Sequence, residues 1–235
     1  MKRTGSPSAR SAETLRLAHR GDWRMAPENS LEALVLAAGI LGCDGVEFDV
    51  RLSRDGVPVL LHDASLERVQ GHPASVWELD AADLRTFGIP SLADVLDALP
   101  DDAFLDIELK GEGHGAATAA ILRKALGRSA DRAVISSFEA ATLTAMRKRL
   151  PGWTAWLNVE RLDSDALSMA HEAGCAVVSS GWRSVTLSWI RRAREVGLGV
   201  AAWTVQQPRS FDRLAAMGVV ACCVEGAALD AGAPS

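Results

Sequence analysis

The chain has 235 residues, of which 48% are hydrophobic and 23% are charged, and its formal net charge is −5. This length and composition are typical of one globular domain, and they fall within the size range of an α/β barrel. The negative charge argues against nucleic acid as a general partner, because that binding depends on basic patches. A single phosphate group needs only a local positive site, so a phosphate-containing substrate remains compatible with this charge.

No run of about 18 apolar residues is present, and residues 1–14 are polar with no apolar signal-peptide core. We therefore expect a disordered leader over 1–14, a cytoplasmic protein and no stable membrane anchor. The cysteines Cys43, Cys175, Cys222 and Cys223 form no CxxC pair, and we expect them to be reduced and mostly buried. The sequence does not indicate an oligomeric state.

From residue 15 onward, short apolar runs alternate with helical patterns. Strands are expected at 15–19, 44–52, 104–109, 134–136, 154–157, 176–179, 199–204 and 219–224, and helices at 29–39, 91–99, 115–126, 139–150, 164–173, 184–196 and 210–217. Asn29 is expected to cap the first helix, with Glu32 closing a capping box. This alternation predicts parallel pairing with right-handed crossovers, and eight strands predict a closed (β/α)8 barrel. A doubly wound open sheet is the alternative.

A further apolar run at 57–62 follows a turn at 54–56 and is expected to form a hairpin arm outside the ring. Residues 63–90 are polar and irregular, which predicts a small insertion after the second strand. No linker divides the chain, so residues 15–235 are expected to form one domain.

Acidic residues gather at the ends of the early strands. Glu47 and Asp49 are spaced i, i+2, which places both carboxylates on one face of their strand. The intervening apolar residues would cover the helix-packed face, so the acids would point to the barrel axis. Two such carboxylates repel each other unless a cation lies between them, and oxygen ligands suit Mg²⁺ or Ca²⁺. The alternative is an outward-facing pair bonded to helix residues.

Of the five histidines, His19 and His62 end strand-like runs beside these acids. A pair of histidines can serve as base and acid near neutral pH, whereas a structural role is the alternative for each. His72, His114 and His171 lie in loop or helix positions, and we interpret them as surface residues.

Three further residues are candidates for substrate contacts. Lys110 is one of only four lysines in a chain with 21 arginines, and it follows Glu108 at the i, i+2 spacing. A compact ammonium there would suit a phosphate oxygen, and Arg20 would suit the same group through two hydrogen bonds. Surface salt bridges are the alternative for both. Trp203 ends the seventh strand and is a candidate for the floor of the pocket.

Taken together, these motifs resemble the glycerophosphodiester phosphodiesterase family over roughly residues 15–226. The motifs that carry the resemblance are His19-Arg20-Gly21, Pro27-Glu28-Asn29-Ser30, Val46-Glu47-Phe48-Asp49-Val50, Asp55-Gly56, His62-Asp63, Ile89-Pro90-Ser91-Leu92, Asp106-Ile107-Glu108-Leu109-Lys110, Ser136-Ser137-Phe138 and Trp203-Thr204-Val205. Each motif alone is weak, but the combination is specific. The resemblance implies a barrel with a short insertion after the second strand.

The resemblance also implies a function and a site. The reaction would be metal-dependent hydrolysis of small-molecule glycerophosphodiesters to glycerol 3-phosphate and an alcohol. His19 and His62 would be the catalytic pair, and Arg20 and Lys110 would contact phosphate. A divalent metal, Mg²⁺ or Ca²⁺ with Mn²⁺ as a further candidate, would be held by Glu47, Asp49 and Glu108.

The chain departs from the family pattern twice. The eighth strand ends in Glu225 where the family has a Thr-Asp pair, and Gln206 stands in place of Asn. We expect both changes to lie away from the metal and histidine residues.

Two rival functions remain. One is a lysophospholipase D or phospholipase C acting on intact lipids, for which Val69, Val76, Trp77 and Leu79 of the insertion would supply an apolar rim. The other is a barrel that binds phosphodiesters without cleaving them. The nucleophile is either the 2-hydroxyl of the substrate glycerol or water.

Overall fold

A computed structural model describes residues 14–127 and 131–230. Within them, eight parallel strands form a ring: β1 (Leu15–His19), β2 (Gly45–Leu52), β4 (Phe104–Leu109), β5 (Ala133–Ser137), β6 (Thr154–Val159), β7 (Val177–Gly181), β8 (Gly199–Val205) and β9 (Ala221–Val224). β1 pairs with both β2 and β9, which closes the ring. The predicted closed barrel is confirmed, and the open sheet is excluded.

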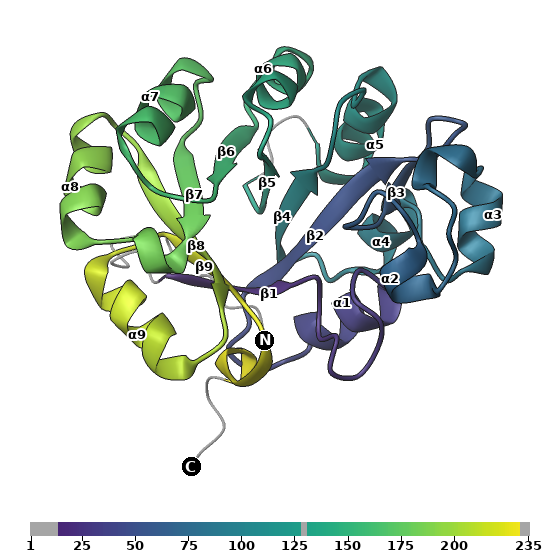
Figure 1. The fold of residues 1–235 in the computed structure, drawn as a ribbon, viewed down its shortest axis with the longest axis horizontal. Helices are drawn as coiled ribbons and strands as arrows, with labels where there is room; N and C mark the ends of the chain where they lie inside the picture. Colours follow the sequence, from purple (N-terminus) through teal and green to yellow (C-terminus); the bar gives the residue numbers. More distant parts are fainter. Residues whose placement is uncertain (1–13, 128–130, 231–235) are drawn as a thin grey trace, which may run out of the picture.

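Helices surround this ring of strands (Figure 1). They are α1 (Leu31–Ala38), α4 (Leu92–Ala98), α5 (Ala116–Leu126), α6 (Ala140–Arg149), α7 (Ser164–Glu172), α8 (Leu187–Glu195) and α9 (Pro208–Met217), with short turns η2 (Trp182–Ser184) and η3 (Gly226–Leu229). Several begin at an N-cap whose side chain accepts a backbone N–H, as Ser91, Asp163 and Thr186 do for α4, α7 and α8. Such caps end the preceding loop and fix where each helix starts on the ring.

The alternation of side chains along the strands divides the core into two parts. Val46, Phe48 and Val50 of β2 are fully buried and pack in the layer between the ring and the helices. A second cluster, which includes Leu17 and Trp156, fills the inside of the barrel. The inward face of β2 therefore carries the residues between these apolar ones, among them its two acids.

The insertion between β2 and α4 has its own small core. It contains β3 (Pro58–Leu60), α2 (Glu67–Gln70), η1 (Val76–Glu78) and α3 (Ala81–Thr86), and β3 pairs antiparallel with β2 outside the ring. Its buried apolar side chains are Val59, Leu61, Leu66, Val76, Leu84 and Ile89. The predicted hairpin arm is confirmed but shorter than 57–62, and the prediction that 63–90 is irregular is wrong because short helices cover this core.

The start of α1 differs from the sequence-based prediction. Ser30, not Asn29, is the N-cap, and its hydroxyl accepts the N–H of Ala33 at 3.2 Å. Asn29 has a left-handed backbone with φ 57°, which is not the extended conformation of an N-cap. Gly21 has φ 83°, and a Cβ there would lie 2.5 Å from the carbonyl carbon of Ala33, so only glycine lets this loop pack on α1.

Among the described residues, no helix is long and apolar enough to span a membrane. The leader expected over residues 1–14 lies outside the described residues except for Thr14, whose hydroxyl donates to the carbonyl of Val219 at 2.7 Å. Of the cysteines, Cys175, Cys222 and Cys223 are buried and Cys43 is half-buried, and all four are free thiols as predicted.

Candidate active site

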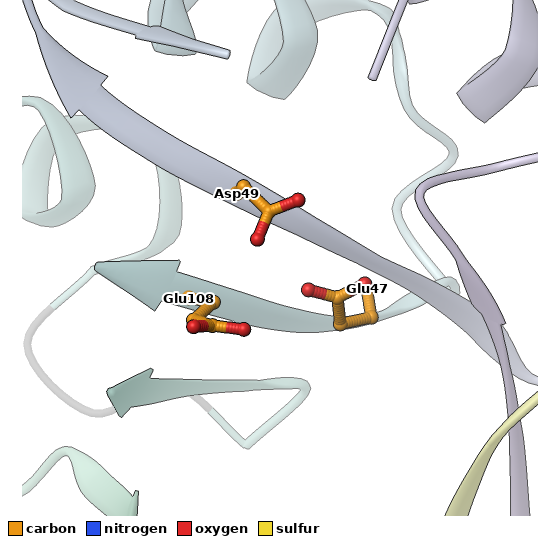
Figure 2. Close-up of side chains that lie close together, drawn as sticks. All are labelled: Glu47, Asp49 and Glu108. Atoms are coloured by element: carbon orange, nitrogen blue, oxygen red, sulfur yellow. The ribbon is translucent and has the colours of Figure 1, made fainter. Parts of the chain in front are cut away.

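Three carboxylates meet on the inner face of the ring, two from β2 and one from β4. The register places Asp49 beside Glu108 on the neighbouring strand, with Glu47 two residues before Asp49. The exposed fractions of Glu47, Asp49 and Glu108 are 4%, 1% and 7%. One oxygen from each lies within 4.8 Å of the others, and the three side chains point toward one another (Figure 2).

This cluster has more negative charge than the protein offsets. Two full charges 4.8 Å apart repel by roughly 3 kcal/mol at an effective dielectric constant of about 20. Burial and the charge of Asp49 raise the pKa of Glu47 well above its ordinary value. The same two causes raise the pKa of Glu108 to about 7, although Lys110 Nζ lies 2.5 Å from its Oε1. Without a further cation, Glu47 and Glu108 are therefore both harder to ionise than an ordinary glutamate.

Asp49 behaves differently because positive and polar groups surround it. Asn29 Nδ2 donates to its Oδ2 at 2.8 Å, and Asn29 Oδ1 accepts the backbone N–H of Asp49 at 3.1 Å. Arg20 Nε lies 3.2 Å from Oδ2, and Lys110 Nζ lies 3.2 Å from Oδ1. Burial alone would raise the pKa of Asp49, but the charges of Lys110 and Arg20 outweigh it and lower the pKa. Asp49 is the carboxylate that stays ionised.

The donor set suits a hard divalent cation. Oε1 of Glu47 is buried and has no hydrogen-bond partner within the described part of the chain. A buried carboxylate oxygen without a partner is costly, and a cation between the three acids would satisfy it. All the ligand atoms offered are carboxylate oxygens, which are the ligands that Mg²⁺ and Ca²⁺ prefer.

The predicted pair of histidines lies at the same cavity as the acids. His19 ends β1 and His62 follows β3, and both line a cavity of about 280 Å³ together with Arg20, Glu47, Glu108 and Lys110. His62 Nδ1 lies 2.7 Å from Asp63 Oδ1, and His19 Nδ1 lies 3.1 Å from Glu225 Oε2. Burial lowers the pKa of His62, so the neutral form of this ring predominates at neutral pH.

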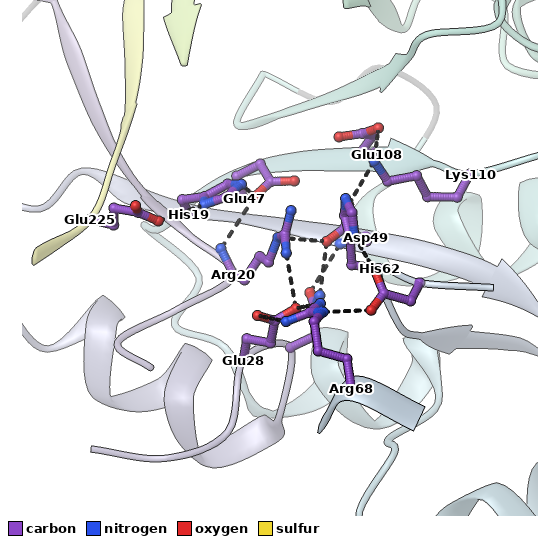
Figure 3. A network of polar contacts seen from close by, with 12 residues as sticks. His19, Arg20, Glu28, Glu47, Asp49, His62, Arg68, Glu108, Lys110 and Glu225 are labelled. Carbon is purple, nitrogen blue, oxygen red and sulfur yellow. Dashed lines mark hydrogen bonds and ion pairs between the residues drawn. The ribbon is translucent and has the colours of Figure 1, made fainter. Parts of the chain in front are cut away.

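A network of ion pairs holds Arg20 and His62 in place (Figure 3). Arg20 has a left-handed backbone with φ 58°, which is uncommon for a residue with a side chain and often marks a functional site. Its Nη1 lies 2.9 Å from Glu28 Oε1, and Arg68 Nη2 lies 2.6 Å from the same oxygen. Arg68 Nε also lies 2.6 Å from Asp63 Oδ2. One arginine of the insertion thus ties the loop after β1 to the residue that contacts His62.

Two aromatic side chains also line the cavity. Phe138 and Trp203 line it, with ring centroids 5.6 Å apart in an edge-to-face arrangement. Lys110 Nζ lies 5.3 Å from the centroid of Phe138, and Trp203 Nε1 donates to the carbonyl of Ser179 at 3.2 Å. Trp203 therefore lies where the sequence placed it, at the cavity, while its role in binding stays a prediction.

Two sequence-based placements are wrong. His114 was expected at the surface, but it is 5% exposed and its Nε2 lies 3.2 Å from the carbonyl of Lys110. Glu225 and Gln206 were expected away from the histidines, but Glu225 contacts His19 and Gln206 Nε2 donates to Glu225 Oε1 at 2.6 Å. His171 is exposed as predicted, and His72 is half-buried.

The sequence reasoning also missed Asp106, which lines the cavity as a fourth buried acid. Burial raises its pKa to about 7, even though Ser136 Oγ donates to its Oδ1 at 2.6 Å. Its position two residues before Glu108, on the same face of β4, is the signal that indicates this location.

A model of the glycerophosphoryl diester phosphodiesterase family matches residues 19–226 of the chain. The chain belongs to this family. The match includes every residue that the geometry brings to the cavity, from His19 to Glu225. The prediction that the chain is a phosphodiester hydrolase is confirmed.

Curated relatives cover nearly the whole chain. The probable glycerophosphodiester phosphodiesterase 2 of Mycobacterium tuberculosis is 32% identical over 241 residues, covering 92% of this chain and 89% of the relative. A glycerophosphodiester phosphodiesterase of Caldanaerobacter subterraneus is 26% identical, covering 88% and 92%. The matches therefore extend over most of this chain and most of each relative.

Solved structures of the family have the same fold. The structure of an Oleispira antarctica phosphodiesterase in complex with the product sn-glycerol-3-phosphate is similar with a TM-score of 0.78 and 25% identity, covering 90% of this chain and 93% of that one. A Silicibacter pomeroyi structure gives a TM-score of 0.79 at 24% identity, covering 92% and 91%. This member of the glycerophosphoryl diester phosphodiesterase family therefore has the same barrel fold as these solved structures.

Proposed function

We propose that this chain hydrolyses glycerophosphodiesters, such as glycerophosphocholine or glycerophosphoethanolamine, to glycerol 3-phosphate and a free alcohol. The observation that carries the proposal is the convergence of metal-binding acids, two histidines and two cations on one small cavity. A volume of about 280 Å³ suits a small, water-soluble head group. The product complex of the Oleispira antarctica relative supports the same substrate class.

Glu47, Asp49 and Glu108 would hold the divalent cation, which we propose to be Mg²⁺ or Ca²⁺, with Mn²⁺ as a substitute. When bound, such an ion would offset the negative charge of the phosphate and polarise the P–O bond. The partnerless oxygen of Glu47 and the acidic character of the cluster support this assignment.

Arg20 and Lys110 would bind the phosphate oxygens. Arg20 is already oriented by Glu28 and Asp49, so little side-chain freedom is lost when it donates to an anion. Lys110 is held between Asp49 and Glu108, and its raised pKa, which the charges of these acids cause against the effect of burial, keeps it cationic. Both cations would orient the phosphorus for attack.

The two histidines would move the protons. Each has a carboxylate at Nδ1, from Glu225 or Asp63, which leaves Nε2 for the substrate. One ring would accept the proton of the glycerol 2-hydroxyl as its oxygen attacks phosphorus. The other, in its cationic form with a proton on both ring nitrogens, would donate the Nε2 proton to the alcohol oxygen as its bond to phosphorus breaks. Water would then open the cyclic phosphate to give glycerol 3-phosphate.

The lipid-cleaving alternative has less support. It needs an apolar rim from Val69, Val76, Trp77 and Leu79, but none of these four lines the cavity of the acids and histidines. Val76 is buried in the core of the insertion, with Leu79 packed against it. Val76 and Leu79 thus serve the folding of the insertion, whereas Trp77 is exposed and Val69 half-buried outside the cavity lining.

Glycerol 3-phosphate release from the glycerophosphodiesters, measured by a coupled assay, tests the proposal together with release of choline or phosphocholine from lysophosphatidylcholine, because cleavage of the lipid leaves the acyl chain on its other product. Glycerophosphocholine and glycerophosphoethanolamine should be cleaved, lysophosphatidylcholine should not, and a chelator should abolish cleavage until Mg²⁺, Ca²⁺ or Mn²⁺ is restored. Full activity in a rigorously metal-free preparation, or preference for the lipid, would overturn the proposal.

A matched pair of substitutions tests the cluster. Glu47→Gln should remove metal-dependent activity and the rise in Tm on adding metal, while Glu172→Gln on the exposed face of α7 should change neither. Circular dichroism shows whether both variants fold. An active Glu47→Gln variant with normal metal dependence would exclude this cluster as the metal site.

A further inference from the structure

We propose that Glu225, itself held by Gln206, is a positioning residue that fixes the ring orientation and the tautomer of His19. The inference rests on the proposed function, because it assumes that His19 transfers a proton. It assigns a role to the two residues at which this chain departs from the family pattern.

Closure of the barrel brings Glu225 to His19. β9 lies beside β1 with Ala18 opposite Val224, so the residues that follow this pair, His19 and Glu225, lie at the same end of the ring. Glu225 Oε2 lies 3.1 Å from His19 Nδ1, and the exposed fractions of the two side chains are 17% for His19 and 13% for Glu225. A hydrogen bond at this distance, largely shielded from water, is strong enough to orient the ring.

Gln206 fixes the carboxylate in turn. It follows β8, and its Nε2 donates to Glu225 Oε1 at 2.6 Å. The backbone N–H of Glu225 also donates to the carbonyl of Val205 at 3.0 Å. One carboxylate oxygen thus accepts from Gln206 and the other faces His19, so rotation of the carboxylate would break two contacts at once.

This arrangement selects one tautomer of His19. The hydrogen bond to His19 lowers the pKa of Glu225, so Glu225 is ionised and can only accept a hydrogen bond. The proton of a neutral His19 ring must then lie on Nδ1, which leaves a lone pair on Nε2. Nε2 is the nitrogen on the side of the acids, 3.9 Å from Glu47 Oε2. A ring held this way is ready to accept a proton from a hydroxyl in the cavity.

Glu225 would therefore affect the chemical step more than substrate binding. Residues that support a catalytic side chain typically contribute about 10–100-fold in activity. Glu225→Ala should lower kcat by about that factor, with KM changed less than about twofold, and Gln206→Ala should have a smaller effect in the same direction. Asp230→Ala is the matched control, since it removes an exposed carboxylate paired with Arg24 in the same terminal segment.

The decisive readout is the tautomer of His19. ¹⁵N NMR of histidine-labelled protein, with the His19 signals assigned through His19→Asn, should show Nδ1–H in the unsubstituted chain and a shift toward Nε2–H in Glu225→Ala. Asp230→Ala should leave these signals unchanged. This measurement needs no turnover, and Gln206→Ala provides a second variant if Glu225→Ala does not fold.

A double-mutant comparison separates this inference from the proposed function. If His19 transfers a proton and Glu225 acts through it, Glu225→Ala should cause no further loss of kcat in a His19→Ala background. An equal loss in both backgrounds, or unchanged His19 signals and kcat in Glu225→Ala, would overturn the positioning role. A loss below tenfold in His19→Ala alone would instead overturn the proposed function of His19, and the NMR result would still decide the positioning.

Discussion

Binding of a divalent ion to this site should release protons, and their number should follow the pKa of the acids. Metal ligands must be deprotonated, so a carboxyl group that is protonated in the metal-free protein must lose its proton on binding. Glu108 has a pKa of about 7, and that of Glu47 lies well above its ordinary value, in both cases because of burial and the charge of Asp49. Asp49 has a lowered pKa and should release nothing near neutral pH.

The size of the release can be worked out for Glu108. With a pKa of about 7, it should release about 0.9 protons per ion at pH 6, about 0.5 at pH 7 and about 0.01 at pH 9. Glu47 adds to these values at each pH where it is still protonated. The affinity for the ion should therefore rise with pH across this range.

Isothermal titration calorimetry measures this number directly. Titrating Mg²⁺ or Mn²⁺ in two buffers of different ionisation enthalpy gives the protons released from the difference in heat. Glu108→Gln should remove its share of the release and weaken binding, whereas the exposed Glu172→Gln should match the unsubstituted chain. Identical heats in both buffers at pH 6 and pH 7, with the ion still bound, would refute the reasoning.

Three further predictions concern single residues. His19→Ala and His62→Ala should each lower turnover by about 10²–10⁴-fold, while the rise in Tm on adding metal should remain. A loss below tenfold, with an unchanged circular dichroism spectrum, would mean that the histidine has a structural role. Burial raises the pKa of Asp106 to about 7, so the folded protein favours the protonated carboxyl group more than the unfolded chain does. The stability that this preference adds is fully present below the unfolded pKa of about 4 and is lost as pH rises through 7. Asp106→Asn should therefore raise the Tm of the metal-free protein more at pH 8 than at pH 5, and the same gain at both would contradict this origin. Burial raises the thiol pKa of Cys175 to about 11 and that of Cys222 to about 12. A thiol reagent should therefore modify these two cysteines only as the protein unfolds. Rapid modification of the native protein would contradict their burial.

The ring and the inward acids could be predicted from sequence because both depend on local patterns. Val46, Phe48 and Val50 alternate with Glu47 and Asp49, and the pleat of a strand turns that alternation into two faces. Because the apolar face packs against the helices, the acids point to the inside of the barrel. The insertion was harder to predict, since helices of four to six residues show too few turns for a periodic pattern.

The errors at Asn29 and His114 have a different cause. Asn before an apolar run is a common N-cap, but here its side chain is bound to Asp49, a partner 20 residues away. His114 stands among glycines next to one acid, Glu112, which indicates a surface loop, yet its ring is buried and contacts the carbonyl of Lys110. The position of Asn29 thus depends on a residue distant in sequence, whereas the hydrogen-bond partners of His114 are four residues away, at Lys110 and Thr118.

The contact between Glu225 and His19 is the clearest case. The two residues are 206 positions apart, and no spacing rule connects them. Only the pairing of β1 with β9 makes them neighbours. A substitution that looked remote from the catalytic residues in sequence is therefore in direct contact with one of them.

The nucleophile gives the last prediction. The glycerol 2-hydroxyl lies on the carbon next to the ester, so its attack on phosphorus needs no second molecule, and such proximity can supply roughly 7–11 kcal/mol. The cavity of about 280 Å³, with both histidines at its wall, suits an attack that keeps all reacting groups within one small substrate.

An analogue with the 2-hydroxyl replaced by hydrogen separates this route from direct attack by water. The analogue keeps the phosphate that Arg20 and Lys110 would bind, so it should inhibit competitively with a Ki near the KM of the natural substrate. It should be cleaved hardly at all, because the oxygen that would attack is missing. During turnover of the natural substrate, ³¹P NMR should show a cyclic phosphate that water then opens. If the deoxy analogue is cleaved at nearly the natural rate and no cyclic phosphate forms, water is the nucleophile, and the histidines act on water instead of on the substrate hydroxyl.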